Sequence, residues 1–87
     1  MKIKDGFLLR KVADRYIAVA VGEESVSFNA MITTNETGAF LWEKLKNDIS
    51  EEELLKALLD EYDVDEETAK ADISEFLEKL RSGKLLD

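Results

Sequence analysis

The 87-residue sequence contains no cysteine and no histidine. Without cysteine, the chain can form neither a disulfide nor a thiolate metal site, and it has no thiol nucleophile. The missing histidine removes the commonest general base and the commonest protein ligand for metals. These absences argue against an enzyme, and we predict that the protein has no catalytic residues, no cofactor and no metal site.

Long apolar runs are missing as well. None of them approaches the roughly 20 residues that a membrane-spanning helix needs. The first residues, MKIKDGFLL, lack the length and the small-residue cleavage site of a secretory signal peptide. We therefore expect a cytoplasmic protein that does not associate with a membrane.

The chain also lacks proline, linkers rich in glycine and serine, low-complexity runs and internal repeats. Hydrophobic residues make up 45% of the sequence and charged residues 37%. Such a balance is typical of a globular domain with its own core and not of a disordered chain. We predict a single domain that spans residues 1–87.

The net charge of −8 is distributed unevenly along the chain. Residues 1–34 contain five Lys or Arg against four Asp or Glu, whereas residues 35–87 contain seven against sixteen. Nucleic-acid binding draws most of its affinity from Lys and Arg side chains that neutralise phosphates. The acidic second part therefore argues against a DNA or RNA partner, and its plainest role is a solvated face that keeps the protein soluble.

The first third of the chain has the apolar pattern of strands. Two runs, residues 7–13 and 16–21, are separated by a tight turn, and a third run begins at Ser25 after a second turn. From Ser25 to Ile32 apolar and polar side chains alternate, which gives a strand one apolar face. We predict a three-stranded antiparallel meander with its last strand at an edge, and with core-facing side chains at Ile17, Val19, Val21, Val26 and Phe28.

After Thr34 the apolar spacing changes from every second residue to every third or fourth. The change predicts a helix from about Glu36 to Lys46, a second helix that opens with a capping box of Ser50 and Glu53, and a third capped by Asp65. The apolar faces of the last two helices contain Leu54, Leu55, Leu58, Leu59, Tyr62, Ala69, Ile73, Phe76, Leu77 and Leu80. The predicted fold class is α+β: a winged-helix-like domain with a three-stranded antiparallel sheet followed by three helices.

Three segments of the sequence resemble a known family. They are FNAMITTNETGAFLWEKL, ISEEELLKALLDEYDVDEETAKADISEFLEKL and the final GKLL. The most specific portion runs from Asn35 to Ala39 and leads to Trp42, with Tyr62 followed closely by Val64. This order and spacing is similar to that of the PqqD family of peptide-modification chaperones, also described as RiPP recognition elements. The resemblance implies a small non-catalytic domain that binds the leader segment of a ribosomally synthesised precursor peptide and presents it to a modifying enzyme, often a radical SAM protein.

The resemblance also implies where a leader peptide would bind. In the family, the leader adds to the third strand, in a groove walled by the last helix, and an exposed strand edge offers the N–H and C=O groups that such an addition needs. Asp72 and Glu75 would select a basic residue and Phe76 would line an apolar pocket. Core packing is the better explanation for Phe76, and solvated helix charges are the better explanation for Asp72 and Glu75. The peptide-binding residues carried over by position are Ser25, Val26, Ser27, Phe28, Asn29, Ala30, Asp72, Glu75, Phe76 and Lys79.

Several alternatives remain open or are excluded at this stage. A general protein–protein adaptor that uses the same strand edge is the main alternative, and a winged-helix DNA-binding protein is a weaker one because no basic helix face emerges. The acidic run DEYDVDEE lacks the central glycine of a calcium-binding loop. The sequence leaves open the precursor peptide, the modifying enzyme, whether the product is pyrroloquinoline quinone or another peptide product, and a homodimer through the edge strand.

Overall fold

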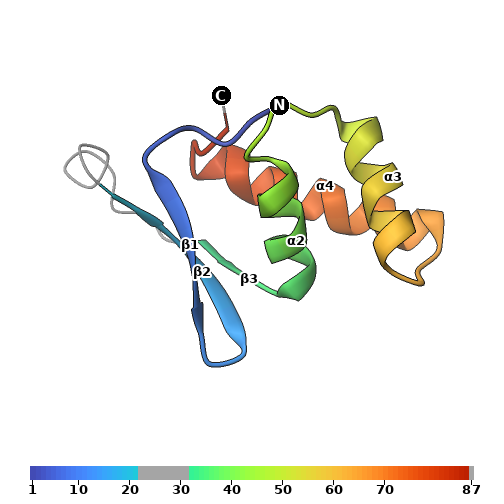
Figure 1. Ribbon diagram of the computed structural model, residues 1–87, viewed down its shortest axis with the longest axis horizontal. Coiled ribbons are helices and arrows are strands. Elements are labelled where there is room, and N and C mark those ends of the chain that lie inside the picture. The colour runs from blue at the N-terminus through green and yellow to red at the C-terminus, as the bar shows by residue number, and fades with distance from the viewer. Residues whose placement is uncertain (22–31, 87) are drawn as a thin grey trace.

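The computed structural model describes residues 1–21 and 32–86 (Figure 1). Within them, β1 (Phe7–Val12), β2 (Arg15–Ala20) and β3 (Ile32–Thr34) form an antiparallel sheet in the order β1-β2-β3. The helices α2 (Glu36–Lys44), α3 (Glu51–Glu61) and α4 (Glu66–Ser82) follow. The predicted α+β class, with an open three-stranded sheet and three helices after it, is confirmed.

Each helix begins at a polar side chain that binds a backbone N–H group. The Asn35 carboxamide oxygen accepts from the Gly38 N–H at 3.0 Å, and the Asp65 carboxylate accepts from the Thr68 N–H at 2.7 Å. Ser50 and Glu53 form the predicted capping box, because each side chain accepts from the other residue's backbone N–H, at 3.1 and 3.2 Å. The helix starts are therefore determined locally, whereas α2 ends at Lys44, two residues before the predicted end.

The hydrophobic core lies among the three helices and extends to the sheet, where α2 and α4 pack against it. Its fully buried large side chains are Leu41, Trp42, Leu45, Leu54, Leu58, Ile73, Leu77, Leu80 and Leu85. Both ends of the described chain close over it: Ile3 pairs with Leu86 in an isolated bridge, and the Lys4 N–H donates to the Leu85 carbonyl at 2.8 Å. Figure 1 shows the two ends side by side. No described helix is long and apolar enough to cross a membrane.

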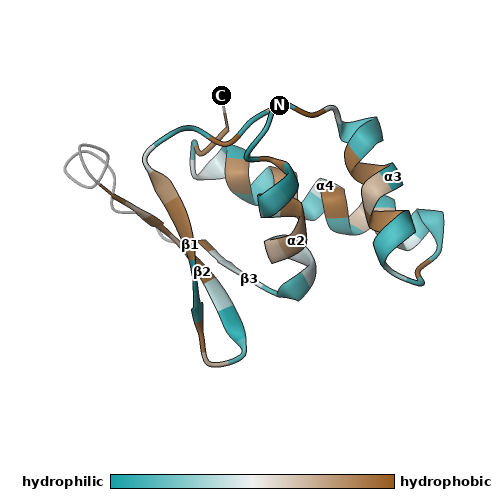
Figure 2. Ribbon diagram, viewed as in Figure 1, coloured by the Kyte–Doolittle hydropathy of each residue, from teal (hydrophilic) through white to brown (hydrophobic). Residues whose placement is uncertain are grey.

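The face that β2 turns toward the core differs from the prediction. Ala18 is buried, with 2% of its surface exposed, while Val21 is 39% exposed. Phe7 and Leu9 of β1 lie opposite Ala20 and Ala18, and both pack against the core. The prediction that Ile17, Val19 and Val21 face inward is therefore wrong. Its physical cause is that the hairpin carries apolar side chains on both faces, since Leu8 lies opposite Val19 on one and Leu9 opposite Ala18 on the other. Both strands of the hairpin contain hydrophobic residues in Figure 2, so alternation alone does not identify the inner face.

The described part of the third strand is short. Ile32, Thr33 and Thr34 pair with Ala18, Ile17 and Tyr16 of β2. Among the described residues no strand pairs with the other side of β3, so β3 lies at an edge of the described sheet, as predicted. The predicted strand residues Ser25 to Ala30, with the core positions Val26 and Phe28, lie outside the described residues.

The hairpin turn between β1 and β2 contains a strained residue. Ala13 has a φ of 58°, in the left-handed region that residues with a Cβ atom enter at a cost of about 1–2 kcal/mol. Glycine adopts such a turn without that cost. We expect Ala13→Gly to raise the free energy of unfolding by about 1 kcal/mol. Urea unfolding measures this free energy. Ala71→Gly, on the exposed face of α4, is the control, and its free energy of unfolding should fall by about 1 kcal/mol. A loss of stability in both variants would contradict the turn assignment.

The cap of α4 makes stability depend on pH. Hydrogen bonds from the side chain and backbone of Thr68 lower the pKa of Asp65 below its ordinary value of 3.8. A carboxylate with a lowered folded-state pKa stabilises the fold above its unfolded pKa, and this contribution is lost as the pH falls through the folded pKa. An asparagine at this position would also cap the helix but would not titrate. We expect wild type to melt at a higher temperature than Asp65→Asn near neutral pH. This difference should disappear as the pH falls well below 3.8. A difference in melting temperature that does not change with pH would contradict this role.

Candidate functional site

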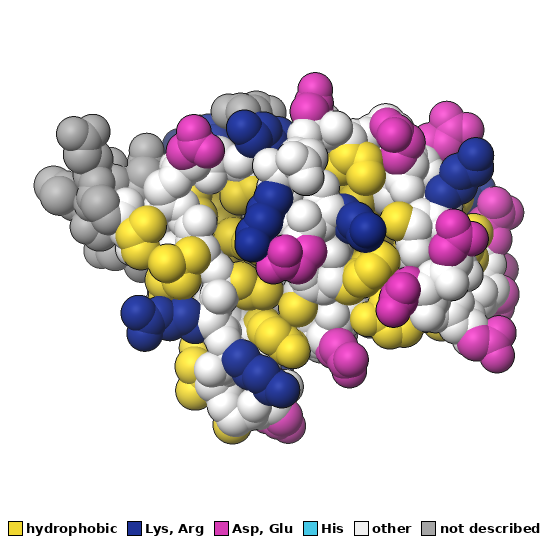
Figure 3. Space-filling view, viewed as in Figure 1, with side chains coloured by type: hydrophobic (Ala, Val, Ile, Leu, Met, Phe, Trp, Pro, Cys, Tyr) yellow, Lys and Arg dark blue, Asp and Glu magenta, His cyan; other side chains and the backbone are white. Residues whose placement is uncertain are grey.

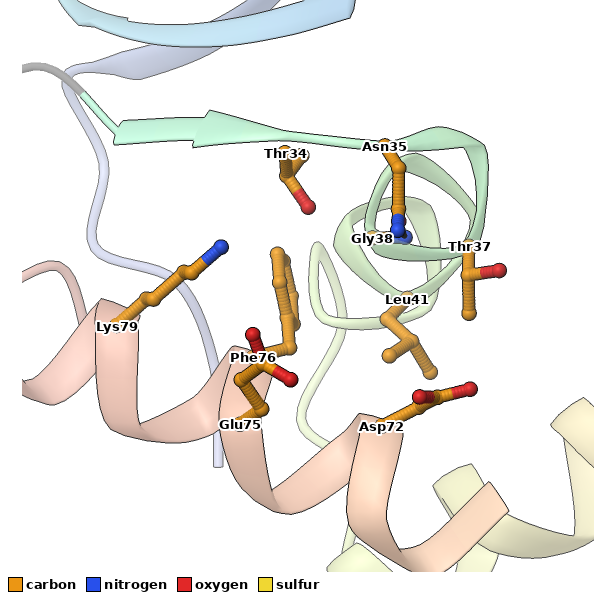
Figure 4. A pocket seen from close by; sticks show the side chains of 9 residues that line it. All are labelled: Thr34, Asn35, Thr37, Gly38, Leu41, Asp72, Glu75, Phe76 and Lys79. Carbon is orange, nitrogen blue, oxygen red and sulfur yellow. Dashed lines mark hydrogen bonds between the residues drawn. The ribbon is translucent and has the colours of Figure 1, made fainter. Parts of the chain in front are cut away.

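A small hollow lies between β3, the start of α2 and one face of α4 (Figure 4). Its volume is about 50 Å³, more than the ~30 Å³ that one water molecule occupies in the liquid. One wall is the junction of β3 and α2, and the other is α4. The residues that line it are Thr34, Asn35, Thr37, Gly38, Leu41, Asp72, Glu75, Phe76 and Lys79.

A close approach between α2 and β3 forms the first wall. A Cβ atom added at Gly38 would lie 1.8 Å from the Thr34 Oγ1 atom and 2.8 Å from the Thr34 Cβ atom. Only glycine fits this contact without displacing Thr34, which is itself buried. The sequence Thr-Asn-Glu-Thr-Gly therefore gives both a helix cap at Asn35 and a helix that lies directly against the edge strand.

The second wall of the hollow is one face of α4, and its side chains meet there because of their helical spacing. Asp72, Glu75, Phe76 and Lys79 stand three or four residues apart, so they share one face of α4. Phe76 is only 4% exposed and belongs to the core, while Asp72 is half-buried and Glu75 and Lys79 are exposed. In Figure 4, Phe76 and Lys79 extend from α4 toward β3. The hollow thus has an apolar floor beneath two carboxylates and one ammonium group.

Lys79 links this helix face to the strand. Its Nζ atom lies 3.5 Å from the backbone carbonyl oxygen of Thr33, to which it donates a long hydrogen bond. In an antiparallel pair, successive residues alternate between those that exchange hydrogen bonds with the neighbouring strand and those that do not. Because the Thr33 carbonyl is directed at α4, the backbone groups of Thr33 face away from β2. This is the backbone that an added strand would meet first.

The structure brings together some of the predicted site residues and not others. Asp72, Glu75, Phe76 and Lys79 line one hollow, while Ser25, Val26, Ser27, Phe28, Asn29 and Ala30 lie outside the described residues. The prediction omitted Thr34, Thr37 and Leu41, and it used Asn35 and Gly38 only as part of the segment that resembles the family. The run from Asn35 to Gly38 was the available signal, since a glycine inside the first turn of a helix often marks a close approach.

The fold and this site define a class: a small α+β domain in which an open-edged sheet and the last helix enclose a shallow groove. The family model described as Coenzyme PQQ synthesis protein D (PqqD) matches residues 11–86, and the chain belongs to this family. The predicted family resemblance is thereby confirmed. No match was found among the curated proteins.

A solved structure has the same architecture over the whole chain. It is described as TbiB1 in complex with the TbiA(beta) leader peptide, and its sequence is 25% identical to this one. The similarity covers 100% of this chain and 95% of the TbiB1 chain, with a TM-score of 0.74. The described elements therefore have counterparts in a protein that was solved with a leader peptide.

Proposed function

We propose that the protein binds the leader segment of a ribosomally synthesised precursor peptide and presents it to a modifying enzyme. The observation that carries this proposal is the similarity, over the whole chain, to a protein that was solved with a leader peptide. An open strand edge beside a helix supports it independently, because extended peptides bind such edges by main-chain hydrogen bonds.

The leader adds as a further strand beside β3. The backbone of Thr33 faces the open side, and Lys79 supplies the hydrogen bond to its carbonyl until a peptide N–H replaces it. Main-chain pairing of this kind gives affinity without requiring particular side chains. The strand side of the groove then continues into Ser25, Val26, Ser27, Phe28, Asn29 and Ala30.

The face of α4 selects among peptides. Asp72 and Glu75 place two carboxylates at the hollow, and a peptide side chain with a positive charge fits them best. The apolar floor formed by Phe76 and Leu41 accommodates the aliphatic part of that side chain. Alternate residues of an added strand point to the same side, so a lysine or arginine on the inner side of the leader would lie in this hollow.

The protein acts as a single binding domain and not as an enzyme. A precursor peptide made on ribosomes is met in the cytoplasm, and we place the function there. The enzyme served modifies the peptide by chemistry of its own, often radical SAM chemistry in this family. The acidic helices, which carry most of the carboxylates in Figure 3, argue against a nucleic-acid partner.

An amide NMR titration tests this function. The labelled protein is titrated with synthetic leader peptides from short open reading frames encoded beside its gene, and with scrambled versions of the same peptides as controls. We expect saturable shifts on residues 25–34 and on α4 with a native leader only. If no leader moves these amides while a neighbouring protein does, the function is that of a general adaptor and the leader-binding proposal is wrong.

A further inference from the structure

Among the described residues, the core packs against only one of the hairpin's two faces. Residues directly opposite one another in an antiparallel pair point to the same side of the sheet. Because Ala18 is buried among the helices, its neighbours on β2 point to the other side. We call this side the outer hairpin face, and its residues are the pairs Leu8 with Val19, Arg10 with Ile17, and Val12 with Arg15.

The outer hairpin face is apolar at its centre. Leu8, Ile17 and Val19 are half-buried and none of them packs against the core, whereas Phe7 and Leu9 on the inner side do. Val12 is 53% exposed. In the described part of the chain, the helices reach the sheet at β2 and β3 from the inner side only. A sheet face that meets water is normally polar, so four aliphatic side chains here indicate a surface that is covered in use.

The charges on this face have one sign. Arg10 and Arg15 lie among its aliphatic residues, and none of its six residues is acidic. The chain from residue 35 onward instead carries seven basic against sixteen acidic residues. Figure 3 shows mainly hydrophobic, Lys and Arg side chains over the hairpin end, with an acidic side chain at its tip, and Asp and Glu side chains gathered over the end that carries α3. An apolar centre that contains arginine and lacks lysine and carboxylates agrees with the depletion of Lys, Glu and Asp in protein–protein interfaces.

We propose that the outer hairpin face docks the peptide-modifying enzyme, through an apolar patch on the enzyme that is rimmed by carboxylates. This inference rests on the proposed function of leader binding. Charge complementarity selects the partner and its orientation, because an acidic surface is attracted to Arg10 and Arg15 and repelled by the helices.

The position of this face suits presentation of a peptide. Thr34 and the hollow lie on the inner side of the sheet and at its β3 edge, whereas the outer hairpin face lies on the opposite side. One molecule can therefore hold a leader and an enzyme at the same time without competition. The sheet itself fixes the distance between the bound leader and the bound enzyme.

The test measures two affinities in parallel. The probes are the purified modifying enzyme encoded beside the gene and a synthetic leader peptide from the same locus. We expect Arg10→Glu with Arg15→Glu to weaken enzyme binding at least about tenfold and to leave leader binding within about twofold. Lys56→Glu with Lys70→Glu is the matched control, since both residues are exposed on the helices, and should change enzyme binding by less than about threefold.

A second variant and the oligomeric state complete the test. Val12→Glu, at an exposed position, should also weaken enzyme binding while the far-UV spectrum stays unchanged. Unchanged enzyme affinity in these folded variants overturns the proposal, as does a wild-type protein that does not bind the enzyme. A concentration-dependent dimer that the Val12→Glu change dissolves would overturn it too, because a second copy would then occupy the face. If the wild-type protein does not bind the leader peptide, the proposed function is wrong, and this outcome is separate from the docking of the enzyme.

Discussion

Thr33→Pro is expected to weaken leader binding strongly while the fold stays intact. The backbone of Thr33 faces away from β2 and toward the groove, so proline removes an N–H group that the sheet does not use. The proline ring also occupies the space that an added strand must enter. We expect a loss of affinity of at least about tenfold, since one main-chain hydrogen bond and its neighbours are lost together.

Isothermal titration calorimetry with the leader peptide measures this effect. Thr33→Ala is the matched control, because it keeps the N–H group and changes only the side chain, and its affinity should stay within about threefold of wild type. The melting temperature of both variants reports whether the sheet is preserved. A folded Thr33→Pro variant that binds the leader as tightly as wild type would mean that the peptide does not add to β3.

Gly38→Ala is expected to destabilise the protein, although alanine is the better helix former. The added Cβ atom meets the Thr34 side chain at 1.8 Å, so Thr34 or α2 has to move. Such overpacking costs about 1–3 kcal/mol, and the helix preference for alanine offsets at most about 1 kcal/mol of that cost. Because the displaced strand is the one that pairs with the leader, peptide affinity should fall as well.

A double-mutant cycle isolates this contact. Thr34→Ala removes the Oγ1 and Cγ2 atoms that the new Cβ would meet, so Gly38→Ala should cost clearly less in that background. Urea unfolding of the four proteins gives the coupling free energy, which we expect to be about 0.5–2 kcal/mol. If the two changes are additive, the close approach of α2 to β3 does not explain the glycine.

The sequence predicted the caps at Ser50 and Asp65 because a helix cap depends on near neighbours, whereas the α4 residues of the site came from the family resemblance. Asn35, Ser50 and Asp65 cap helices through N–H groups three residues away. The resemblance supplied Asp72 and Lys79, and the helical repeat then places both side chains on one face of α4. Such features depend on the local chain and can be read without knowing the fold.

Only the tertiary structure decided which side of the hairpin is buried and what lies against β3. Both sides of the hairpin are apolar, and the packing of the helices made Ala18, not Ile17 or Val19, the buried residue. The contact between Gly38 and Thr34 and the reach of Lys79 to Thr33 join segments that the pattern treats separately. The sequence by itself determined the first two strands and the three helices, since periodicity and caps are local. The groove and the outer hairpin face depend on how these elements pack in space, which local patterns do not encode.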